Sequence, residues 1–253
     1  MDTVTKPRWL VHGVTRPEAT RLFCFPHGGG SVAEYIRWTR DLATVEAAGI
    51  QLPGRGARQR EPALTSMPRL VDAVADGVDF AAPCAFFGHS LGSLVAYEVV
   101  REIRRRGGRL PMHLVVSGFP GPHLHRTTTP LHTLPDDELL DAVTRRHAGI
   151  PAGVLEDSEL RAMAADCLRS DYRILETYRW EPGAPLDLPV TVFAGRDDEI
   201  DDDALDGWRR HTTGPVRIRR FPGGHFYLRD RPGVVMRAVA RAVAVAEPPK
   251  SSC

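Results

Sequence analysis

The segment FFGHSLG at residues 86–92 is the feature that most constrains the fold of this chain. A short apolar run ends in a G-x-S-x-G pattern, in which Gly88 and Gly92 flank Ser90. The pattern is typical of a strand that turns sharply into a helix and exposes the serine hydroxyl at the end of a sheet. Glycines at the two flanking positions let the strand and helix backbones approach without Cβ clashes. The segment therefore predicts a strand–turn–helix unit with Ser90 as a candidate nucleophile.

Short apolar runs alternate along the chain with segments of helical periodicity. The runs end in glycine or proline, and we expect strands at residues 21–25, 45–52, 84–87, 112–116, 190–194 and 216–221. Between them we expect helices over residues 32–43 (after a Ser31 cap), 68–80, 91–105 and 231–245. This alternation predicts an α/β fold, with a mostly parallel sheet and helices on both faces. A length of 253 residues suits a single domain over residues 1–253.

A helical insertion over residues 121–185 interrupts this alternation. The stretch of about 70 residues between Ser117 and Leu188 has helical periods and no strand signal. We expect it to lie as a lid over the carboxyl ends of the strands, above Ser90. Its apolar faces are expected to line a channel: Leu155, Leu160, Met163, Leu168 and Leu175. The alternative is a helical excursion on the surface without a role.

The charge balance is nearly even, with 33 Lys and Arg against 32 Asp and Glu and a formal net charge of +1. Such a balance indicates neither a nucleic-acid partner nor an anionic membrane. The start MDTVTKPRWL lacks the apolar core of a signal peptide, and no run is long enough to span a bilayer, so we expect a cytoplasmic protein. The cysteines lie far apart, without metal-ligand spacing, and are expected to be reduced: Cys24, Cys84, Cys167 and Cys253. We expect no metal and no cofactor.

A serine nucleophile needs a base, a residue that orients the base, and donors for the oxyanion. In α/β-hydrolases the triad follows in the order Ser, Asp or Glu, His. Here the strand at 190–194 runs into the acidic turn GRDDE, and the strand at 216–221 runs into the glycine-rich loop GGHF. His225 and Asp198 therefore complete a candidate triad with Ser90.

The choice of acid rests on position. Asp198 lies three residues past Gly195, where the chain has left the strand and can turn inward. The stretch after the preceding strand, residues 116–120, offers no carboxylate. The neighbouring carboxylates of the same turn remain alternatives: Asp197, Glu199 and Asp201.

Backbone N–H groups are the expected oxyanion donors. One comes from Leu91, which follows the nucleophile, and the other from the PHGGG loop, with Gly28 favoured. His27 in that loop is expected to shape the loop rather than to act as a second base.

Arginines form the densest charge cluster, at positions 101, 104, 105, 106 and 109. The helix at 91–105 carries this cluster roughly 24 Å from the serine. We therefore expect it to complement the negative end of the helix dipole rather than to dock a partner. Better-placed cations near the mouth of the site are Arg55, Arg58, Arg60, Arg169 and Arg173.

Six segments, spread in order over nearly the whole chain, carry a family resemblance. They are FPHGGG (25–30), LPGRGARQREP (52–62), GHSLG (88–92), LRSDY (168–172), GRDD (195–198) and PGGHFYL (222–228). Together they resemble the type II thioesterases, the stand-alone hydrolases that accompany polyketide and nonribosomal peptide synthases. GHSLG is common to many hydrolases, whereas LPGRG…REP together with GGHFYL is fairly specific to this family.

The resemblance implies an α/β-hydrolase fold, the triad Ser90, Asp198 and His225, and a flexible helical lid. It also implies hydrolysis of stalled or mis-primed acyl groups from the phosphopantetheine arm of acyl or peptidyl carrier proteins. Asp166, where relatives often have proline, and Ala57, where a charge is frequent, depart from the pattern and bear on lid shape and acyl preference. Two other functions are a free-standing esterase or lipase for small esters and a hydrolase-fold binding protein without turnover.

Overall fold

One mixed sheet forms the centre of the molecule, for which the computed structural model describes residues 9–80, 83–127, 130–147 and 150–244. Within these ranges seven strands occur in the order β1-β3-β2-β4-β5-β6-β7. Every neighbouring pair is parallel except β1 and β3, which are antiparallel. The strands are β1 Leu10–His12, β2 Thr20–Phe25, β3 Val45–Ile50, β4 Cys84–His89, β5 His113–Ser117, β6 Val190–Gly195 and β7 Val216–Phe221. The mostly parallel sheet expected from the sequence is confirmed.

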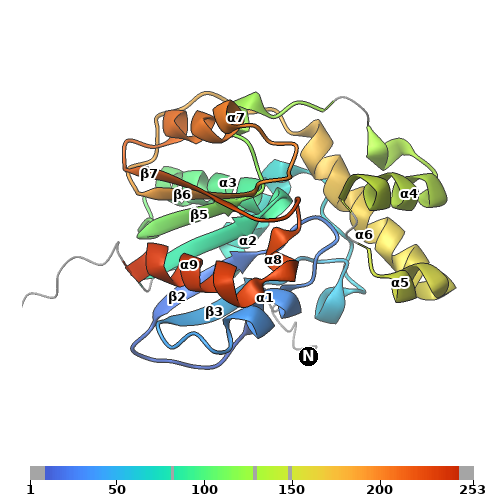
Figure 1. The fold of residues 1–253 in the computed structure, drawn as a ribbon, viewed down its shortest axis with the longest axis horizontal. Helices are drawn as coiled ribbons and strands as arrows, with labels where there is room; N and C mark the ends of the chain where they lie inside the picture. The colour runs from blue at the N-terminus through green and yellow to red at the C-terminus, as the bar shows by residue number, and fades with distance from the viewer. Residues whose placement is uncertain (1–8, 81–82, 128–129, 148–149, 245–253) are drawn as a thin grey trace, which may run out of the picture.

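Helices cover both faces of the sheet (Figure 1). On one face lie α2 (Met67–Gly77) and α3 (Leu91–Arg105), which contact each other along their lengths. On the other face lie α1 (Val32–Thr39) and α9 (Pro232–Ala244). The shorter helices α7 (Asp202–Asp206) and α8 (Tyr227–Asp230) follow β6 and β7. This arrangement confirms the α/β class.

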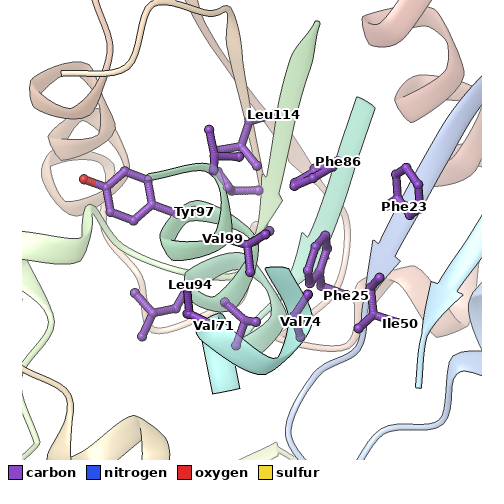
Figure 2. Close-up of a cluster of buried hydrophobic side chains, with 14 of the residues drawn as sticks. Phe23, Phe25, Ile50, Val71, Val74, Phe86, Leu94, Tyr97, Val99 and Leu114 are labelled. Atoms are coloured by element: carbon purple, nitrogen blue, oxygen red, sulfur yellow. The ribbon is translucent and has the colours of Figure 1, made fainter. Parts of the chain in front are cut away.

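Two apolar clusters hold the helices on the sheet. The larger one fills the space between the sheet and helices α2 and α3, and Figure 2 shows aromatic and branched side chains from strands and helices that meet there. Phe23, Phe25 and Phe86, from adjacent strands, are each at most 1% exposed. Burial of each such ring contributes about 1.5–3 kcal/mol. The carboxyl ends of β4, β5 and β6 are thereby fixed relative to one another.

The elements differ from the sequence expectations in several places, mostly by one or two residues at an end. The antiparallel edge strand β1 was not expected, because three residues leave too short a pattern to recognise. Helix α1 begins after Ser31, whose side chain accepts a hydrogen bond from the Ala33 N–H, but ends at Thr39 rather than at residue 43. Helix α2 ends at Gly77, and the apolar residues Val78 and Phe80 continue into the core in non-helical backbone.

The stretch between β5 and β6 is helical, as expected, and lies at one end of the sheet (Figure 1). It holds α4 (Asp136–His147), α5 (Ala152–Glu156) and α6 (Ser158–Thr177), together with the 3₁₀ turns Pro122–Leu124 and Leu131–Thr133. These helices pack a small apolar cluster of their own that includes Leu139, Leu140 and Leu168. We call residues 121–185 the helical insertion.

The cysteines Cys24, Cys84 and Cys167 are free and buried, and burial raises the pKa of each thiol to about 12. Cys253 lies outside the described residues. Among the helices in the described ranges, none combines the length and the apolar character needed to cross a membrane.

Candidate active site

Ser90 stands at a strained turn between β4 and α3. Its backbone has φ 54° and ψ −122°, and within the described residues it is the only non-glycine residue with a positive φ. Strain of this kind persists only where the surroundings hold it in place. A Cβ on Gly88 would lie 2.2 Å from the Gly92 carbonyl oxygen, and a Cβ on Gly92 would lie 2.1 Å from the Phe25 carbonyl oxygen. Both positions therefore require glycine, and the expected strand–turn–helix unit is present.

Hydrogen bonds tie this turn to the end of β5. The Ser90 N–H donates to the Ser117 carbonyl oxygen at 2.7 Å. The Ser93 hydroxyl accepts from the Ser117 N–H at 2.9 Å and lies 2.9 Å from the carbonyl oxygens of Gly88 and Ser117. These contacts are buried and join three points of the turn, so they hold the Ser90 backbone in its strained conformation.

The loops after β6 and β7 bring an acid to a histidine. The His225 Nδ1 lies 2.9 Å from the Asp198 Oδ2, and the two side chains are 10% and 5% exposed. Burial raises the pKa of Asp198, but the hydrogen bond and positive charge of His225, with the Glu199 N–H, outweigh it and hold the pKa below its usual value. Asp198 is therefore a carboxylate that can orient the imidazole.

The other carboxylates of this turn have different positions. Asp197 is exposed, and Glu199 is largely exposed and lies 3.7 Å from Arg146. Asp201 caps α7, where its side chain accepts a hydrogen bond from the Ala204 N–H at 2.7 Å. Of the four carboxylates considered, Asp198 is the one that the structure places against His225.

The glycine-rich loop forms a tight turn beside the serine. The Gly30 N–H donates to the His27 carbonyl oxygen at 2.8 Å, so Gly28 and Gly29 are the central residues of the turn, and Gly29 has φ +70°. Gly28, Leu91 and Ser90 line the same cavity. The two backbone positions expected to supply oxyanion donors therefore line the cavity that Ser90 also lines.

His27 is buried in this loop with both ring nitrogens engaged. Its Nδ1 lies 2.7 Å from the Tyr35 hydroxyl, and its Nε2 accepts from the Arg229 guanidinium at 3.1 Å. Burial, followed by the positive charge of Arg229, holds the pKa of His27 well below its usual value. The ring is a neutral fixed part of the loop, which fits the expectation that it shapes the loop.

One cavity of about 570 Å³ joins these groups and extends beneath the helical insertion. Ser90, Asp198 and His225 lie on its wall, which the ends of the strands form. Facing them are apolar side chains of the insertion: Val143, Ile150, Val154, Ala164, Leu168 and Leu175. The cavity therefore combines a polar reaction end with an apolar compartment.

The apolar lid residues expected from the sequence divide into two groups. Leu168 and Leu175 line the cavity, as expected. Leu155 packs within the insertion, Leu160 is 45% exposed, and the Met163 sulfur accepts from the Gln59 side chain. The expectation was wrong for these three because helical spacing identifies an apolar face without identifying what that face covers.

Two histidines near His225 were not recognised from the sequence. The His147 ring, at the end of α4, stacks on the His225 ring with centroids 4.4 Å apart and an interplanar angle of 30°. Burial, followed by the positive charges of His225 and Arg146, lowers the pKa of His147 to about 3. His89 lies with its ring 5.0 Å from that of His225, and its Nδ1 is 2.9 Å from the Ser117 hydroxyl. His147 is the last residue of α4 and His89 the last residue of β4, and neither position carries a sequence signal for a contact with His225.

Three of the arginines expected near the mouth are structural. Arg55 is 11% exposed and pairs with Asp171, while Arg58 is buried, lies 3.9 Å from the Trp9 ring centroid and pairs with Glu61. The Arg169 guanidinium donates to the carbonyl oxygens of residues 132 and 134 and pairs with residue 136. The expectation that these side chains are available for docking was wrong, because each is held by buried or backbone acceptors. Arg60 and Arg173 are exposed.

Three arginines of the cluster at the end of α3 make contacts within the protein, while the expected complement to the helix dipole stays a prediction. Arg104 donates to the carbonyl oxygens of Ala184 and Pro185. Arg105 and Arg106 pair with Glu102 on the same helix, and Arg106 also pairs with acidic residues of α2.

Asp166 and Ala57, the two residues that depart from the family pattern, are both exposed. In the described ranges, no group of three or more His, Cys, Asp or Glu side chains is placed to hold a metal ion.

A parallel sheet, a serine on a strained strand-to-helix turn and an acid–histidine pair on the next strand ends define the architecture of an α/β-hydrolase. The family model for the thioesterase domain matches residues 20–243. The chain therefore belongs to the thioesterase family, and it is a thioester hydrolase.

Individual relatives agree with this assignment. The chain is 41% identical over 218 residues to the thioesterase PikA5 of Streptomyces venezuelae, covering 84% of this chain and 77% of that protein. It is 33% identical over 226 residues to the gramicidin S biosynthesis protein GrsT of Aneurinibacillus migulanus, covering 87% and 88%.

Solved structures give the same result. The type II thioesterase BorB of the borrelidin biosynthetic cluster superposes with a TM-score of 0.84 at 33% identity, covering 95% of this chain and 99% of that one. The RedJ thioesterase of the prodiginine pathway of Streptomyces coelicolor superposes with a TM-score of 0.83 at 34% identity, covering 97% of each chain. The expected α/β-hydrolase fold and the expected resemblance to type II thioesterases are confirmed.

Proposed function

We propose that the protein removes acyl groups from the phosphopantetheine arm of carrier proteins in polyketide or nonribosomal peptide biosynthesis, so that stalled or mis-primed assembly lines are cleared. The observation that carries this proposal is the single cavity in which Ser90, the Asp198–His225 pair and the glycine-rich loop face an apolar compartment. The similar proteins GrsT, named for gramicidin S biosynthesis, and BorB, the type II thioesterase of the borrelidin biosynthetic cluster, support it.

The reaction proceeds through an acyl-enzyme on Ser90. His225 takes the hydroxyl proton as the Ser90 oxygen attacks the thioester carbonyl carbon, and the N–H groups of Gly28 and Leu91 stabilise the oxyanion. The carbon–sulfur bond then breaks, and the sulfur takes the proton from His225 and leaves as the pantetheine thiol. Water then attacks the acyl-enzyme carbonyl carbon as the same imidazole takes its proton. The bond from that carbon to the Ser90 oxygen breaks, the free acid leaves, and His225 returns the proton to the Ser90 oxygen.

Asp198 acts through the imidazole. Its carboxylate accepts a hydrogen bond from the Nδ1–H of His225, which leaves Nε2 free to accept the serine proton. The lowered pKa of Asp198 keeps this acceptor ionised throughout the range in which a histidine base works. The pair therefore favours one tautomer and stabilises the imidazolium that forms during each proton transfer.

The helical insertion at residues 121–185, within one α/β-hydrolase domain over 1–253, acts as a lid on the acyl compartment. Most of its buried apolar side chains form a cluster of their own, whereas Ile174 near the end of α6 belongs to the larger cluster on the sheet. We therefore expect α4, α5 and the first part of α6 to move more than the end of α6. We expect amide hydrogens in residues 139–179 to exchange faster than those of the central strands. Equal protection in a hydrogen-exchange experiment would contradict a moving lid.

Carrier recognition is weak and only modestly dependent on salt. The exposed cations Arg60 and Arg173 remain available to an acidic carrier, while Arg55, Arg58 and Arg169 are engaged within the protein. Each exposed pair contributes less than about 1 kcal/mol. Low affinity suits an editing enzyme, because tight binding would remove productive intermediates.

Hydrolysis of matched substrates tests the proposal. Acetyl or propionyl groups are presented on a carrier protein, on a pantetheine mimic, on coenzyme A and as a simple oxygen ester. We expect kcat/KM to be highest for the carrier-bound thioester and to fall as salt is raised. If kcat/KM is highest for the oxygen ester and no higher for the carrier-bound thioester than for the small thioesters, the protein is a small-ester esterase instead.

A variant of the nucleophile tests the mechanism. Ser90→Ala should keep the fold and lower hydrolysis by several orders of magnitude. A fluorophosphonate probe should label the wild type and not the variant, which also distinguishes an enzyme from a binding protein without turnover. Turnover near that of the wild type in Ser90→Ala would exclude the acyl-enzyme.

A further inference from the structure

Three of the segments that carry the family resemblance meet at the carboxylate of Asp171. Asp171 belongs to LRSDY on α6, Arg55 to LPGRG, and Gly29 to the glycine-rich loop. Arg55 donates from Nη1 to Oδ2 at 2.7 Å and from Nη2 to Oδ1 at 2.6 Å, and the Gly29 N–H donates to Oδ2 at 2.7 Å. One side chain of the insertion thus joins the LPGRG loop to the glycine-rich loop, and the mechanism places the glycine-rich loop beside the reacting carbonyl.

The ion pair between Asp171 and Arg55 is largely buried, which restricts the movement of the Asp171 carboxylate. The Asp171 side chain is 1% exposed and that of Arg55 is 11% exposed. The two parallel N–H···O bonds fix the plane of the carboxylate as well as its position. The oxygen that accepts from Gly29 is therefore held in one place, and its position follows that of helix α6.

The Gly29 N–H belongs to the central peptide of the tight turn at residues 27–30. With φ +70° at Gly29, this turn has the backbone of a type II turn, which differs from type I by a flip of that central peptide. Two successive glycines have little preference of their own between these forms. The Asp171 carboxylate attracts the N–H and would repel the carbonyl oxygen that a flip would bring to it, so it selects the observed form.

We propose that Asp171 is a positioning residue that, with Arg55, holds the oxyanion loop from the lid, so that the oxyanion hole is complete only when α6 is docked. This inference rests on the proposed role of Gly28 as an oxyanion donor. Gly28 is the other central residue of the turn, so its backbone angles change when the central peptide flips. Within the glycine-rich loop, His27 is hydrogen-bonded to Tyr35 and Arg229, which lie outside the insertion. The hydrogen bond from the Gly29 N–H to Asp171 joins the same loop to the insertion.

Two double variants separate the Gly29 contact from the ion pair. Arg55→Met with Asp171→Ala removes the buried charges together and leaves the Gly29 N–H without its acceptor. Arg55→Met with Asp171→Asn also removes both charges but keeps an amide oxygen within reach of that N–H. The measurements are kcat and KM for an acetyl thioester of N-acetylcysteamine, and the affinity for an alkyl boronic acid that forms a tetrahedral adduct with Ser90.

The expected result is a parallel loss in the variant without the acceptor. Its kcat and boronate affinity should both fall about 10- to 100-fold, below the loss for complete removal of an oxyanion donor, while KM changes little. The asparagine variant should recover most of both. Equal kcat in the two double variants, or a fall in kcat without loss of boronate affinity, would overturn the proposal.

Two controls complete the experiment. Arg169→Gln removes hydrogen bonds from the Arg169 guanidinium to backbone carbonyl oxygens within the insertion, and it should leave boronate affinity unchanged. If a double variant does not fold, Asp171→Ala alone is measured, which also removes the acceptor of the Gly29 N–H, and unchanged kcat and boronate affinity in it overturn the proposal. Absence of boronate inhibition in the wild type would instead contradict the proposed Ser90 mechanism. Failure of the Asp171 proposal can therefore be distinguished from failure of the proposed function.

Discussion

Replacing His113 by glutamine should make the stability of this protein less dependent on pH. His113 begins β5, is 3% exposed, and its Nε2 lies 2.8 Å from the Thr191 hydroxyl. Burial, followed by the positive charge of Arg217, lowers its pKa from 6.5 to about 4. The folded protein therefore keeps this imidazole neutral at a pH where the unfolded chain binds a proton.

The magnitude follows from the two pKa values. Because the unfolded state binds more protons, this site's effect on stability is small above pH 6.5, and the loss accumulates as the pH falls from 6.5 to about 4. Between about pH 7.5 and pH 5, the site lowers the free energy of unfolding by about 2 kcal/mol. That is a large part of the 5–15 kcal/mol typical of a domain. His211, which burial and then the charge of His123 hold at a pKa of about 3, acts in the same direction.

Urea unfolding of the wild type and of His113→Gln at both pH values is the assay. Glutamine places a polar atom near Thr191 and does not titrate, so any constant difference in stability cancels in the pH dependence. The free energy lost by the wild type on acidification should exceed that lost by the variant by about 2 kcal/mol. Parallel curves for the two proteins would refute the reasoning. Activity at neutral pH should be unchanged, because His113 begins its strand and Ser90 lies beyond the carboxyl end of the neighbouring strand.

Three further predictions concern the active site. Asp198→Asn should lower kcat on the order of 10³–10⁴-fold through the wrong imidazole tautomer, whereas Asp197→Asn should change it little; the reverse order would reassign the acid. Gly92→Ala should prevent folding or remove activity, because its Cβ would lie 2.1 Å from a backbone oxygen, and a stable, active variant would contradict this steric argument. His147→Phe should retain more activity than His147→Ala, because a phenyl ring can still stack on His225; equal losses of kcat would show that stacking does not matter.

Local sequence patterns were sufficient for the main strands, the helices and the order of the candidate catalytic residues along the chain. A buried parallel strand reads as a short apolar run, and a turn of fixed geometry requires glycine at fixed offsets, so GHSLG could be interpreted without a structure. The positions of Asp198 and His225 followed in the same way from where each strand ends. The short edge strand β1 was missed, since its three residues have no pattern distinct from a loop.

The contacts between distant segments were decided only by the tertiary structure. Arg55 was expected to be a docking cation, yet it is buried against Asp171, which lies 116 residues away in the sequence. The stacking of His147 on His225 likewise depends on where the end of α4 lies over the strands. The sequence by itself determined which backbone conformations and apolar faces form, because these depend on neighbouring residues. Which charged side chains form buried ion pairs depends on how the insertion packs against the sheet. Burial therefore decides whether an arginine pairs with a carboxylate inside the protein or remains exposed for a partner.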